Sequence, residues 1–353
     1  MKKNKIGQVS RRDFIRKAST GIAVLAGGAH LGMCSKASTQ PNSDSLKKAL
    51  VGGGNDNGSV VQMSDDLLPR RILGKSGMEV SMLSFGGGSQ FMKNRNGKWE
   101  PLLERALEMG INLFDTSFSY NGSEERFAEI LTPIRQDIFI STKFDGMKDG
   151  KRDVDVMMYE FETSLKRLKT DYVDVLMIHA VDDGDSISHI EKTVYKKMDQ
   201  LKKEGVIKNI GFSSMNSAVK SRDLLKALEF DVCLLAINPT TYGNYEEITI
   251  PVAREKNVGI IAMKVMRDVV KKPDVTAKEL MHWALDRKSV ATAVIGHHGM
   301  NILEENAALV EEFKPSLVPE DRWGYLERRM HRYAGAHTLS WAHPNYKDEY
   351  RMA

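Results

Sequence analysis

The stretch from Gly110 to Tyr120, with the sequence GINLFDTSFSY, holds the pattern that decides the fold. A short apolar run at residues 111–114 is followed directly by the carboxylate of Asp115. We interpret the run as a buried strand and place Tyr120 in the loop after it. A strand that ends in an acid and is followed by a phenol is how barrel enzymes present reactive groups at one rim.

Short β-branched runs alternate with amphipathic helical segments from about residue 67 onward, which predicts βα units and a parallel sheet. We expect strands at residues 81–85, 113–115, 138–143, 173–179, 207–212, 232–238, 259–264 and 291–295. We expect helices after them at residues 102–109, 124–131, 154–168, 190–203, 219–230, 252–256, 277–287 and 302–313. Eight such units in about 240 residues predict an α/β protein with a (β/α)8 TIM barrel. A short β-hairpin at residues 70–80 precedes the barrel and a C-terminal tail follows it.

A doubly wound open sheet is the alternative, and it would place a glycine-rich dinucleotide turn after the first strand. Gly86, Gly87 and Gly88 do follow that strand. They lack the G-x-G-x-x-G spacing, and no helix is expected to begin there. The barrel is therefore favoured.

Composition narrows the class of protein. Of the 353 residues, 41% are hydrophobic, which is enough for a sizeable core. The 51 basic and 47 acidic residues are scattered along the chain and leave a net charge of +4. This distribution indicates a solvated surface and no nucleic-acid partner. Outside the N-terminal segment, no apolar run reaches the roughly 18 residues that span a bilayer.

The N-terminal segment has a separate character. Residues 10–17, SRRDFIRK, contain the pair Arg11 and Arg12 and are followed by an apolar run at residues 18–33 that is diluted by glycine. With Phe14 in the expected order, this resembles a twin-arginine (Tat) export signal. The resemblance implies the Tat export machinery as a partner and a periplasmic or otherwise extracytoplasmic location for a protein exported folded. A basic N-terminal arm is the alternative, although an arm does not need the apolar run.

The two cysteines have different settings. Cys34 follows Met33 in the outline of a lipoprotein processing site, where a small residue is expected before the cysteine. A lipid anchor at Cys34 and cleavage elsewhere, for instance after Ala37, both stay open. Cys233 lies in an apolar run and reads as a core residue. Two cysteines supply neither a disulfide framework nor an iron–sulfur cluster, and we expect no metal site.

The chain divides into four expected segments. These are a Tat-type signal at residues 1–37, a flexible linker at 38–66, the barrel at 67–314 and an aromatic, basic C-terminal extension at 315–353. We expect the extension to wrap the barrel or to cover the mouth of its pocket.

Four polar side chains follow successive strands of the expected barrel. Asp115, Lys143 and His179 each end a strand, and Tyr120 lies in the loop after the first of these strands. Each has a structural alternative when taken alone: a turn cap, a surface aromatic, a solvated strand end or a structural histidine. Because active sites of barrels lie at the C-terminal ends of the strands, their shared position favours one common site.

The four residue types suit the reduction of a carbonyl group. Hydride addition to a carbonyl carbon creates an alkoxide, which needs a proton donor. A phenol such as Tyr120, with an ordinary pKa of about 10, becomes a better donor beside the charge of Lys143. Asp115 would hold that lysine charged. We expect His179 to orient the substrate oxygen as a neutral imidazole.

These motifs resemble those of the aldo/keto reductase family. The match comprises Gly110-x-x-x-x-Asp115-Thr116 with Tyr120, Ser141-Thr142-Lys143, Ile178-His179, the run 211–216 (GFSSMN) and Glu305-Asn306. It covers residues 67–309. The resemblance implies a barrel without a Rossmann domain, an extended nicotinamide dinucleotide, and Asp115, Tyr120, Lys143 and His179 as the catalytic residues.

The resemblance also implies cofactor-binding residues. Ser213 and Asn238 fall where the family bonds the nicotinamide carboxamide, with Asn in place of the usual Gln. Met263 replaces an aromatic ring that stacks on the nicotinamide, and Lys264 would meet a phosphate or end the strand in solvent. Gly296, Glu305 and Asn306 match positions around the adenosine, where a polar helix face is the alternative for the last two.

Two loops depart from the family pattern. Residues 295–301 contain no arginine or lysine for a 2′-phosphate, so that NADP and NAD both remain candidates. His297 and His298 would help only in part near neutral pH. Residues 265–268, VMRD, stand where relatives have a glycine-rich loop that clamps the pyrophosphate.

We therefore predict an NAD(P)-dependent oxidoreductase of the aldo/keto reductase type that interconverts a small-molecule carbonyl and an alcohol, with Tyr120 as the proton donor. Two alternatives stay open. One is a dinucleotide-binding sensor or low-turnover barrel. The other is an oxidoreductase of a sugar derivative with a retained, recycled NAD(H).

Overall fold

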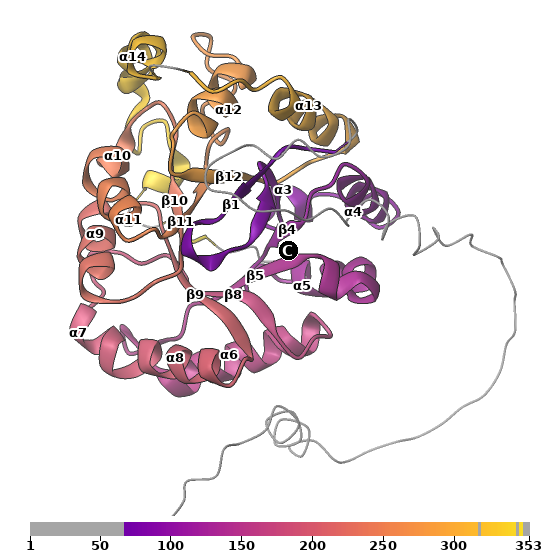
Figure 1. Ribbon diagram of the computed structural model, residues 1–353, viewed down its shortest axis with the longest axis vertical. Coiled ribbons are helices and arrows are strands. Elements are labelled where there is room, and N and C mark those ends of the chain that lie inside the picture. The colour runs from indigo at the N-terminus through magenta and orange to yellow at the C-terminus, as the bar shows by residue number, and fades with distance from the viewer. Residues whose placement is uncertain (1–66, 317–318, 344–345, 349–353) are drawn as a thin grey trace, which may run out of the picture.

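A closed barrel of parallel strands forms the centre of the molecule, and helices surround it (Figure 1). The computed structural model describes residues 67–316, 319–343 and 346–348. Going round the barrel, the order of the eight strands is β10-β11-β12-β3-β4-β5-β8-β9. The predicted (β/α)8 barrel is confirmed.

The barrel strands are short runs that are buried on both faces, as parallel sheets covered by helices require. They are β3 (Leu83–Gly86), β4 (Leu113–Asp115), β5 (Phe139–Phe144), β8 (Val173–Ile178), β9 (Ile207–Ser214), β10 (Val232–Ala236), β11 (Gly259–Met263) and β12 (Val290–Ile295). All eight predicted strands are present. The first begins later than expected because Ser81 pairs with Arg70 in a hairpin before the chain enters the barrel.

The outer helices bury one face and expose the other. They are α4 (Trp99–Glu108), α5 (Ser123–Leu131), α6 (Val154–Arg167), α7 (Ile187–Ile190), α8 (Lys196–Lys203), α9 (Ala218–Ala227), α10 (Tyr245–Ile248), α11 (Ile250–Glu255), α12 (Ala277–Leu285) and α13 (Met300–Glu311). A π turn at Glu191–Tyr195 joins α7 to α8, so the helix predicted at residues 190–203 is longer and irregular.

Helix ends follow local sequence signals. Gly110 and Gly205 follow α4 and α8 with φ of 84° and 73°, the left-handed conformation that glycine adopts without strain. Thr276 and Glu279 form a capping box at the start of α12. Asp153 caps α6 by accepting hydrogen bonds from two backbone N–H groups.

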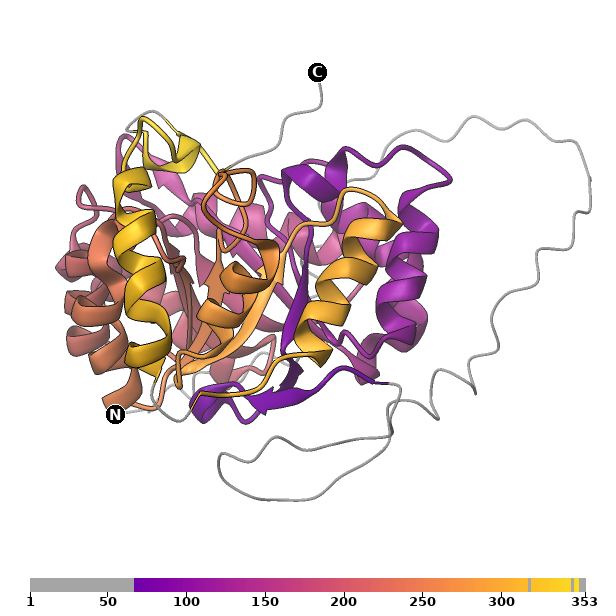
Figure 2. The same cartoon turned by 90° about the horizontal axis from the view of Figure 1, so that it is seen from above.

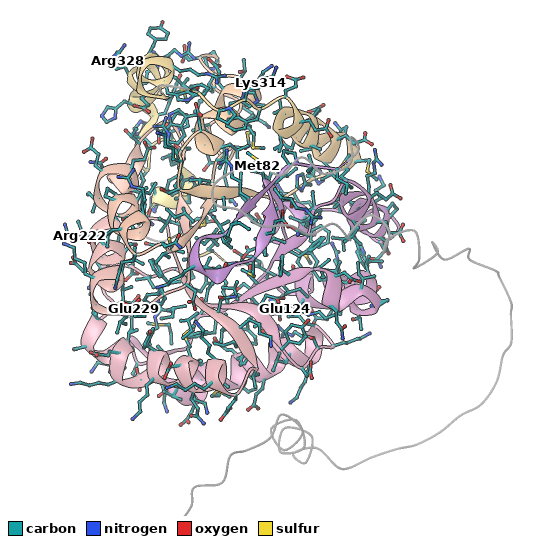
Figure 3. All side chains as sticks on the ribbon, in the orientation of Figure 1. Met82, Glu124, Arg222, Glu229, Lys314 and Arg328 are labelled. Carbon is teal, nitrogen blue, oxygen red and sulfur yellow. The ribbon has the colours of Figure 1, made fainter. Side chains whose placement is uncertain are left out.

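The two ends of the barrel differ. A hairpin of β1 (Arg70–Ile72) and β2 (Glu79–Ser81) lies across the end where the strands begin, and the described yellow segment at residues 331–343 lies at the opposite end (Figure 2). Side chains fill the barrel and the space between strands and helices (Figure 3). Because the hairpin covers the end where the strands begin, a site can form at the C-terminal ends of the strands.

Helix α14 (Pro319–Met330) packs on the outside of the barrel against α12. The indole N–H of Trp323 donates to Asp286 over 2.6 Å, and Trp283 donates to Glu327 over 2.9 Å. The described residues 331–343 and 346–348, here called the tail, then cross the rim of the barrel. Trp341 is fully buried there and its ring lies 5.3 Å from that of Tyr242.

Several smaller elements were not predicted. A short helix, α3 (Ser89–Met92), follows β3, and a small hairpin of β6 (Met147–Lys148) and β7 (Lys151–Arg152) follows β5. Among the described residues, none of the helices is long and apolar enough to cross a membrane. The predicted signal and linker at residues 1–66 lie outside the described part of the chain.

Candidate active site

The C-terminal strand ends bring the four predicted catalytic residues together. Asp115 ends β4, Lys143 lies near the end of β5 and His179 directly follows β8. Asp115 is paired with Ser141 in the register of β4 and β5, so the two strand ends are level. Tyr120 stands in the loop between β4 and α5, with its ring 5.8 Å from that of His179.

Lys143 and Asp115 form a buried ion pair. The Nζ of Lys143 lies 2.7 Å from Oδ2 of Asp115 and donates a second hydrogen bond of 2.7 Å to the carbonyl of Thr116. Ser141 donates to the other oxygen of Asp115 over 2.6 Å. The side chains of the pair are only 1% and 7% exposed. The carboxylate thus compensates an ammonium that would otherwise be buried without a counter-charge.

Tyr120 is also buried, and its hydroxyl donates to Oδ2 of Asp348 over 2.8 Å. Lys143 Nζ lies 5.2 Å from the centre of its ring. The pKa of Tyr120 is nevertheless raised well above its ordinary value, first by burial and then by the carboxylates of Asp348 and Asp115. With Asp348 in place, burial and these carboxylates therefore outweigh the lowering of this pKa that we expected from Lys143.

His179 lies between two carboxylates. Its Nδ1 is 2.9 Å from Oδ1 of Asp145, and its Nε2 is 3.4 Å from Oδ2 of Asp348. Burial lowers the pKa of the imidazole, but the bonds to Asp145 and Asp348 outweigh burial and raise this pKa above its ordinary value. We expected a neutral imidazole, whereas this arrangement favours the charged form.

A cavity of about 830 Å³ opens beside these residues. Its volume is in the range of sites for cofactors and drug-sized ligands. Its lining includes Asp115 and Tyr120 and five of the predicted cofactor residues: Met263, Lys264, Gly296, Glu305 and Asn306.

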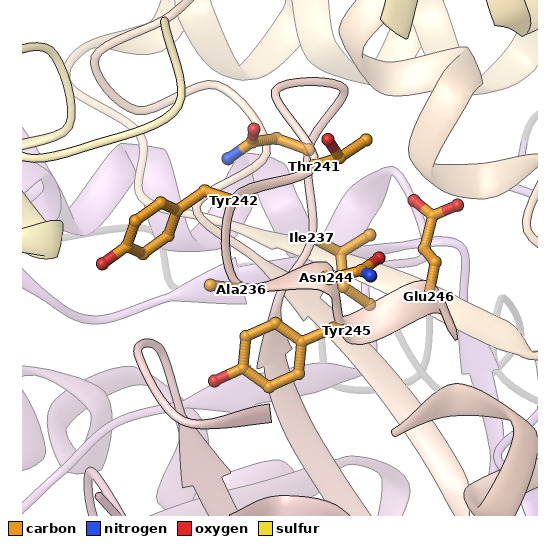
Figure 4. Close-up of a pocket in the computed structure, with 8 residues that line it drawn as sticks. Ala236, Ile237, Thr241, Tyr242, Asn244, Tyr245 and Glu246 are labelled. Atoms are coloured by element: carbon orange, nitrogen blue, oxygen red, sulfur yellow. The ribbon is translucent and has the colours of Figure 1, made fainter. Parts of the chain in front are cut away.

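The other two predicted cofactor residues bond within the protein. Ser213 accepts a hydrogen bond of 2.8 Å from the backbone N–H of Ala180. The side-chain oxygen of Asn238 accepts two bonds from Thr240. Asn238 lines a separate pocket of about 10 Å³ with Tyr242 and other residues (Figure 4). A contact from Ser213 or Asn238 to a nicotinamide stays a prediction.

The two histidines that follow β12, His297 and His298, lie in different surroundings. His297 is fully buried with its ring 5.1 Å from that of Phe85, and burial lowers the pKa of its imidazole to about 3. It is therefore neutral near pH 7, and the expectation that it helps to bind a 2′-phosphate is wrong. His298 is exposed and lines the large cavity.

Three further residues of the site were missed in the sequence. Asp145 follows Lys143 by two positions, and that spacing at a strand end was a usable signal. Arg267 lines the cavity and bonds Ser89 over 3.2 Å. Asp348 carries no local signal, because the tail reaches the site only through the fold.

The walls of the cavity suit a ligand with phosphates. Arg267, Lys93 and Lys271 supply positive charge, whereas the ammonium of Lys264 is paired with Asp348. The backbones of Gly86 and Gly296 approach so closely that a Cβ on Gly86 would lie 3.1 Å from the nitrogen of Gly296. Among the described residues, no group of three or more His, Cys, Asp or Glu side chains is arranged to hold a metal ion.

A family model described as the aldo/keto reductase family matches residues 82–268, which contain all four rim residues. The chain belongs to the aldo/keto reductase family. Membership makes it an oxidoreductase by class. Asp115, Tyr120, Lys143 and His179 lie together in this family member as the resemblance implied.

Relatives and solved structures agree with this assignment. L-galactose dehydrogenase of Arabidopsis thaliana is 25% identical over 287 residues, which cover 69% of this chain and 88% of that protein. The structure of a putative aldo-keto reductase from Pseudomonas aeruginosa matches with a TM-score of 0.59 and 27% identity, covering 68% of this chain and 93% of that one. The holo form of an aldo-keto reductase from Bacillus halodurans has a TM-score of 0.61 at 22% identity and covers 76% and 96% of the two chains. This last likeness concerns the fold alone.

Proposed function

We propose that this protein interconverts a carbonyl and an alcohol with a nicotinamide dinucleotide, and that Tyr120 is the proton donor. One observation carries the proposal: the hydroxyl of Tyr120 and Nε2 of His179 both point to a single negatively charged oxygen, Oδ2 of Asp348. That oxygen stands in for the alkoxide that forms during carbonyl reduction. Donors aimed at a developing negative oxygen are the main source of stabilisation in such reactions.

The other residues support the two donors. When bound, the reduced nicotinamide would supply the hydride. Tyr120 passes its proton to the substrate oxygen, and Lys143 stabilises the phenolate that results. Asp115 holds Lys143 in place through the 2.7 Å ion pair. A substrate oxygen in place of Asp348 also removes the carboxylate that is the second largest cause of the raised pKa of Tyr120.

The large cavity is the proposed dinucleotide site. Met263 would pack on the nicotinamide, Arg267 would meet the pyrophosphate, and Glu305 and Asn306 would lie at the adenosine end. Residues 295–301 have no arginine or lysine, although Lys93 lines the same cavity. We propose NAD or NADP as the cofactor, and titration with both dinucleotides distinguishes them.

The decisive variant is Tyr120→Phe. We expect it to lose carbonyl reduction and to bind the dinucleotide with unchanged affinity, measured by quenching of tryptophan fluorescence. Tyr159→Phe is the matched control, because Tyr159 is 67% exposed on the outside of α6. A Tyr120→Phe enzyme as active as the wild type would rule out the proposed proton donor.

A second candidate, oxidation of a sugar derivative, is favoured by the likeness to L-galactose dehydrogenase over 69% of this chain. Under this alternative the site runs in the oxidative direction, with the phenolate of Tyr120 accepting the alcohol proton. Turnover of L-galactose with NAD or NADP, and none of 2-oxo acids or simple carbonyls, would select it.

We also propose export of the folded protein by the Tat machinery, from the pair Arg11 and Arg12, and lipid attachment at Cys34 as an alternative to cleavage. Replacing both arginines by lysine should leave the protein in the cytoplasm, as cell fractionation would show. Mass spectrometry of the exported form distinguishes lipid at Cys34 from a cut after Ala37.

A further inference from the structure

The tail places a carboxylate in the candidate active site. Oδ2 of Asp348 accepts from Tyr120 over 2.8 Å and lies 3.4 Å from Nε2 of His179. Oδ1 lies 2.7 Å from Nζ of Lys264 and accepts from Tyr346 over 2.9 Å. The Asp348 side chain is only 11% exposed. The carboxylate is therefore bound inside the site and does not merely touch its surface.

The two oxygens of Asp348 mark two adjacent binding positions. The first lies on Tyr120 and His179, where the reacting oxygen of a substrate belongs under the proposed function. The second lies on Lys264, which directly follows β11 and whose side chain is 8% exposed. A ligand that fills both positions therefore carries a negative oxygen next to its reacting oxygen.

The backbone conformation of Lys264 is energetically unfavourable. Its backbone has φ of 60°, a left-handed conformation that is unfavourable for a side chain of this kind. Its only ion pair among the described residues is the one to Asp348. Strained residues at strand ends commonly serve a site, and a buried ammonium needs a negative partner.

A neutral substrate does not satisfy this site. If it displaced Asp348 from Tyr120, the ammonium of Lys264 would lose the 2.7 Å bond to its partner. A substrate with a carboxylate beside its carbonyl replaces both oxygens of Asp348 at once. Discrimination by an unpaired buried polar group is stronger than discrimination by shape.

We propose that Lys264, together with Tyr120 and His179, forms a subsite for a small 2-oxo acid or its 2-hydroxy acid, and that Asp348 occupies this subsite until substrate displaces it. The inference rests on the proposed function, because it names the substrate class of the same site. On reduction, the C=O π bond at C2 breaks, a hydride from the dinucleotide forms the new C–H bond, and the proton of Tyr120 completes the hydroxyl. The dinucleotide is oxidised and the carboxylate on Lys264 is unchanged.

Binding is tested with oxamate, a non-reducible isostere of pyruvate, by titration calorimetry of the full chain. Lys264→Met should weaken oxamate binding by about 10- to 100-fold, which is the loss of one charge-assisted hydrogen bond. Asp348→Asn removes the charge of the competing group and should tighten binding. The wild type, Lys264→Met and Asp348→Asn should show no measurable binding of oxamide, the neutral analogue of oxamate.

Lys148→Met is the matched control for the lysine, because Lys148 is exposed on β6 away from the cavity lining. Its oxamate affinity should equal that of the wild type. Thermal unfolding of each variant checks that the fold is retained, and dinucleotide affinity of Lys264→Met checks that the lysine serves the substrate. An unchanged oxamate affinity in Lys264→Met, or weaker binding in Asp348→Asn, would overturn the inference.

Turnover separates this inference from the proposed function. Reduction of pyruvate that falls about 10- to 100-fold in kcat/KM in Lys264→Met, with no fall for a neutral aldehyde, supports both. Reduction of the aldehyde without any preference for pyruvate retains the function and overturns the subsite. Oxamate binding in the predicted order without turnover of any carbonyl retains the subsite and overturns the function.

Discussion

Replacing Asp145 by asparagine tests how the site controls its protons. The change removes a negative charge 2.9 Å from Nδ1 of His179 and leaves an acceptor of the same shape. Asp348, Tyr120 and Ser117 also face the imidazole, and Glu160 interacts with it electrostatically. Loss of the charge should lower the pKa of His179 and leave less of the charged form, which donates a hydrogen bond from Nε2 to the substrate oxygen, near pH 7.

The size of the expected effect follows from the lowered pKa of Asp145. Burial raises the pKa of Asp145, but bonds to His179 and Ser119 and the charge of Arg152 outweigh burial and lower this pKa from 3.8 to about 2. At 1.36 kcal/mol per unit this corresponds to about 2.5 kcal/mol. This energy is shared among His179, Ser119 and Arg152. The Asp145 side chain is also 40% exposed, so that water screens the interaction. We therefore assign about 1 kcal/mol to His179, or roughly a fivefold effect on kcat/KM.

The sign follows from the raised pKa of His179. Reduction that needs the charged imidazole is present at low pH and is lost as the pH rises through the pKa of the folded protein. In Asp145→Asn that loss should occur at a lower pH, by somewhat less than one unit.

The assay is the pH profile of kcat/KM for carbonyl reduction. Asp149→Asn is the control, since Asp149 is an exposed carboxylate between β6 and β7 whose left-handed backbone suits asparagine. Thermal unfolding confirms that each variant is folded. If the alkaline limbs of Asp145→Asn and the wild type coincide, Asp145 does not set the proton affinity of His179.

The remaining predictions concern stability and are tested by urea unfolding. Trp323→Phe should lower the free energy of unfolding by about 1.5 kcal/mol more than Trp341→Phe. Trp323 donates to the carboxylate of Asp286, whereas the buried Nε1 of Trp341 has no partner among the described residues; equal losses would contradict this. Burial, only partly offset by Arg287, raises the pKa of Glu246 to about 7, so its folded-state pKa exceeds the unfolded one and stability falls as the pH rises from about 4.5 to 7. Glu246→Gln should therefore gain up to about 3 kcal/mol at pH 8 and nothing near pH 4, and an equal effect at both pH values would contradict the sign.

The barrel and the meeting of the rim residues could be predicted because both follow from local pattern. Each strand is a continuous apolar run, and parallel strands in register carry their last residues to one level. Asp115 and Lys143 therefore meet once β4 and β5 pair. The start of β3 was predicted too early, because the hairpin expected at residues 70–80 extends to Ser81, which pairs with Arg70.

The protonation of the site could not be predicted from the same pattern. The pKa values of Tyr120 and His179 depend on carboxylates of the surrounding fold, and Asp348 comes from a tail that is distant in sequence. His297 and His298 are adjacent and equally polar. Only packing shows that the first lies against Phe85 in the core and the second on the cavity.

The position of Asp348 in the site affects where a tag can be attached to this protein. Asp348 lies at the catalytic rim, so an affinity tag attached close to it would compete with substrate or pull the tail away. The first described residue, Leu67, instead lies beside Gly110 in the turn between α4 and β4, where the strands begin. A tag or a surface tether on that side leaves the rim facing the solution, and kinetic constants from differently tagged versions of the protein should not be compared directly.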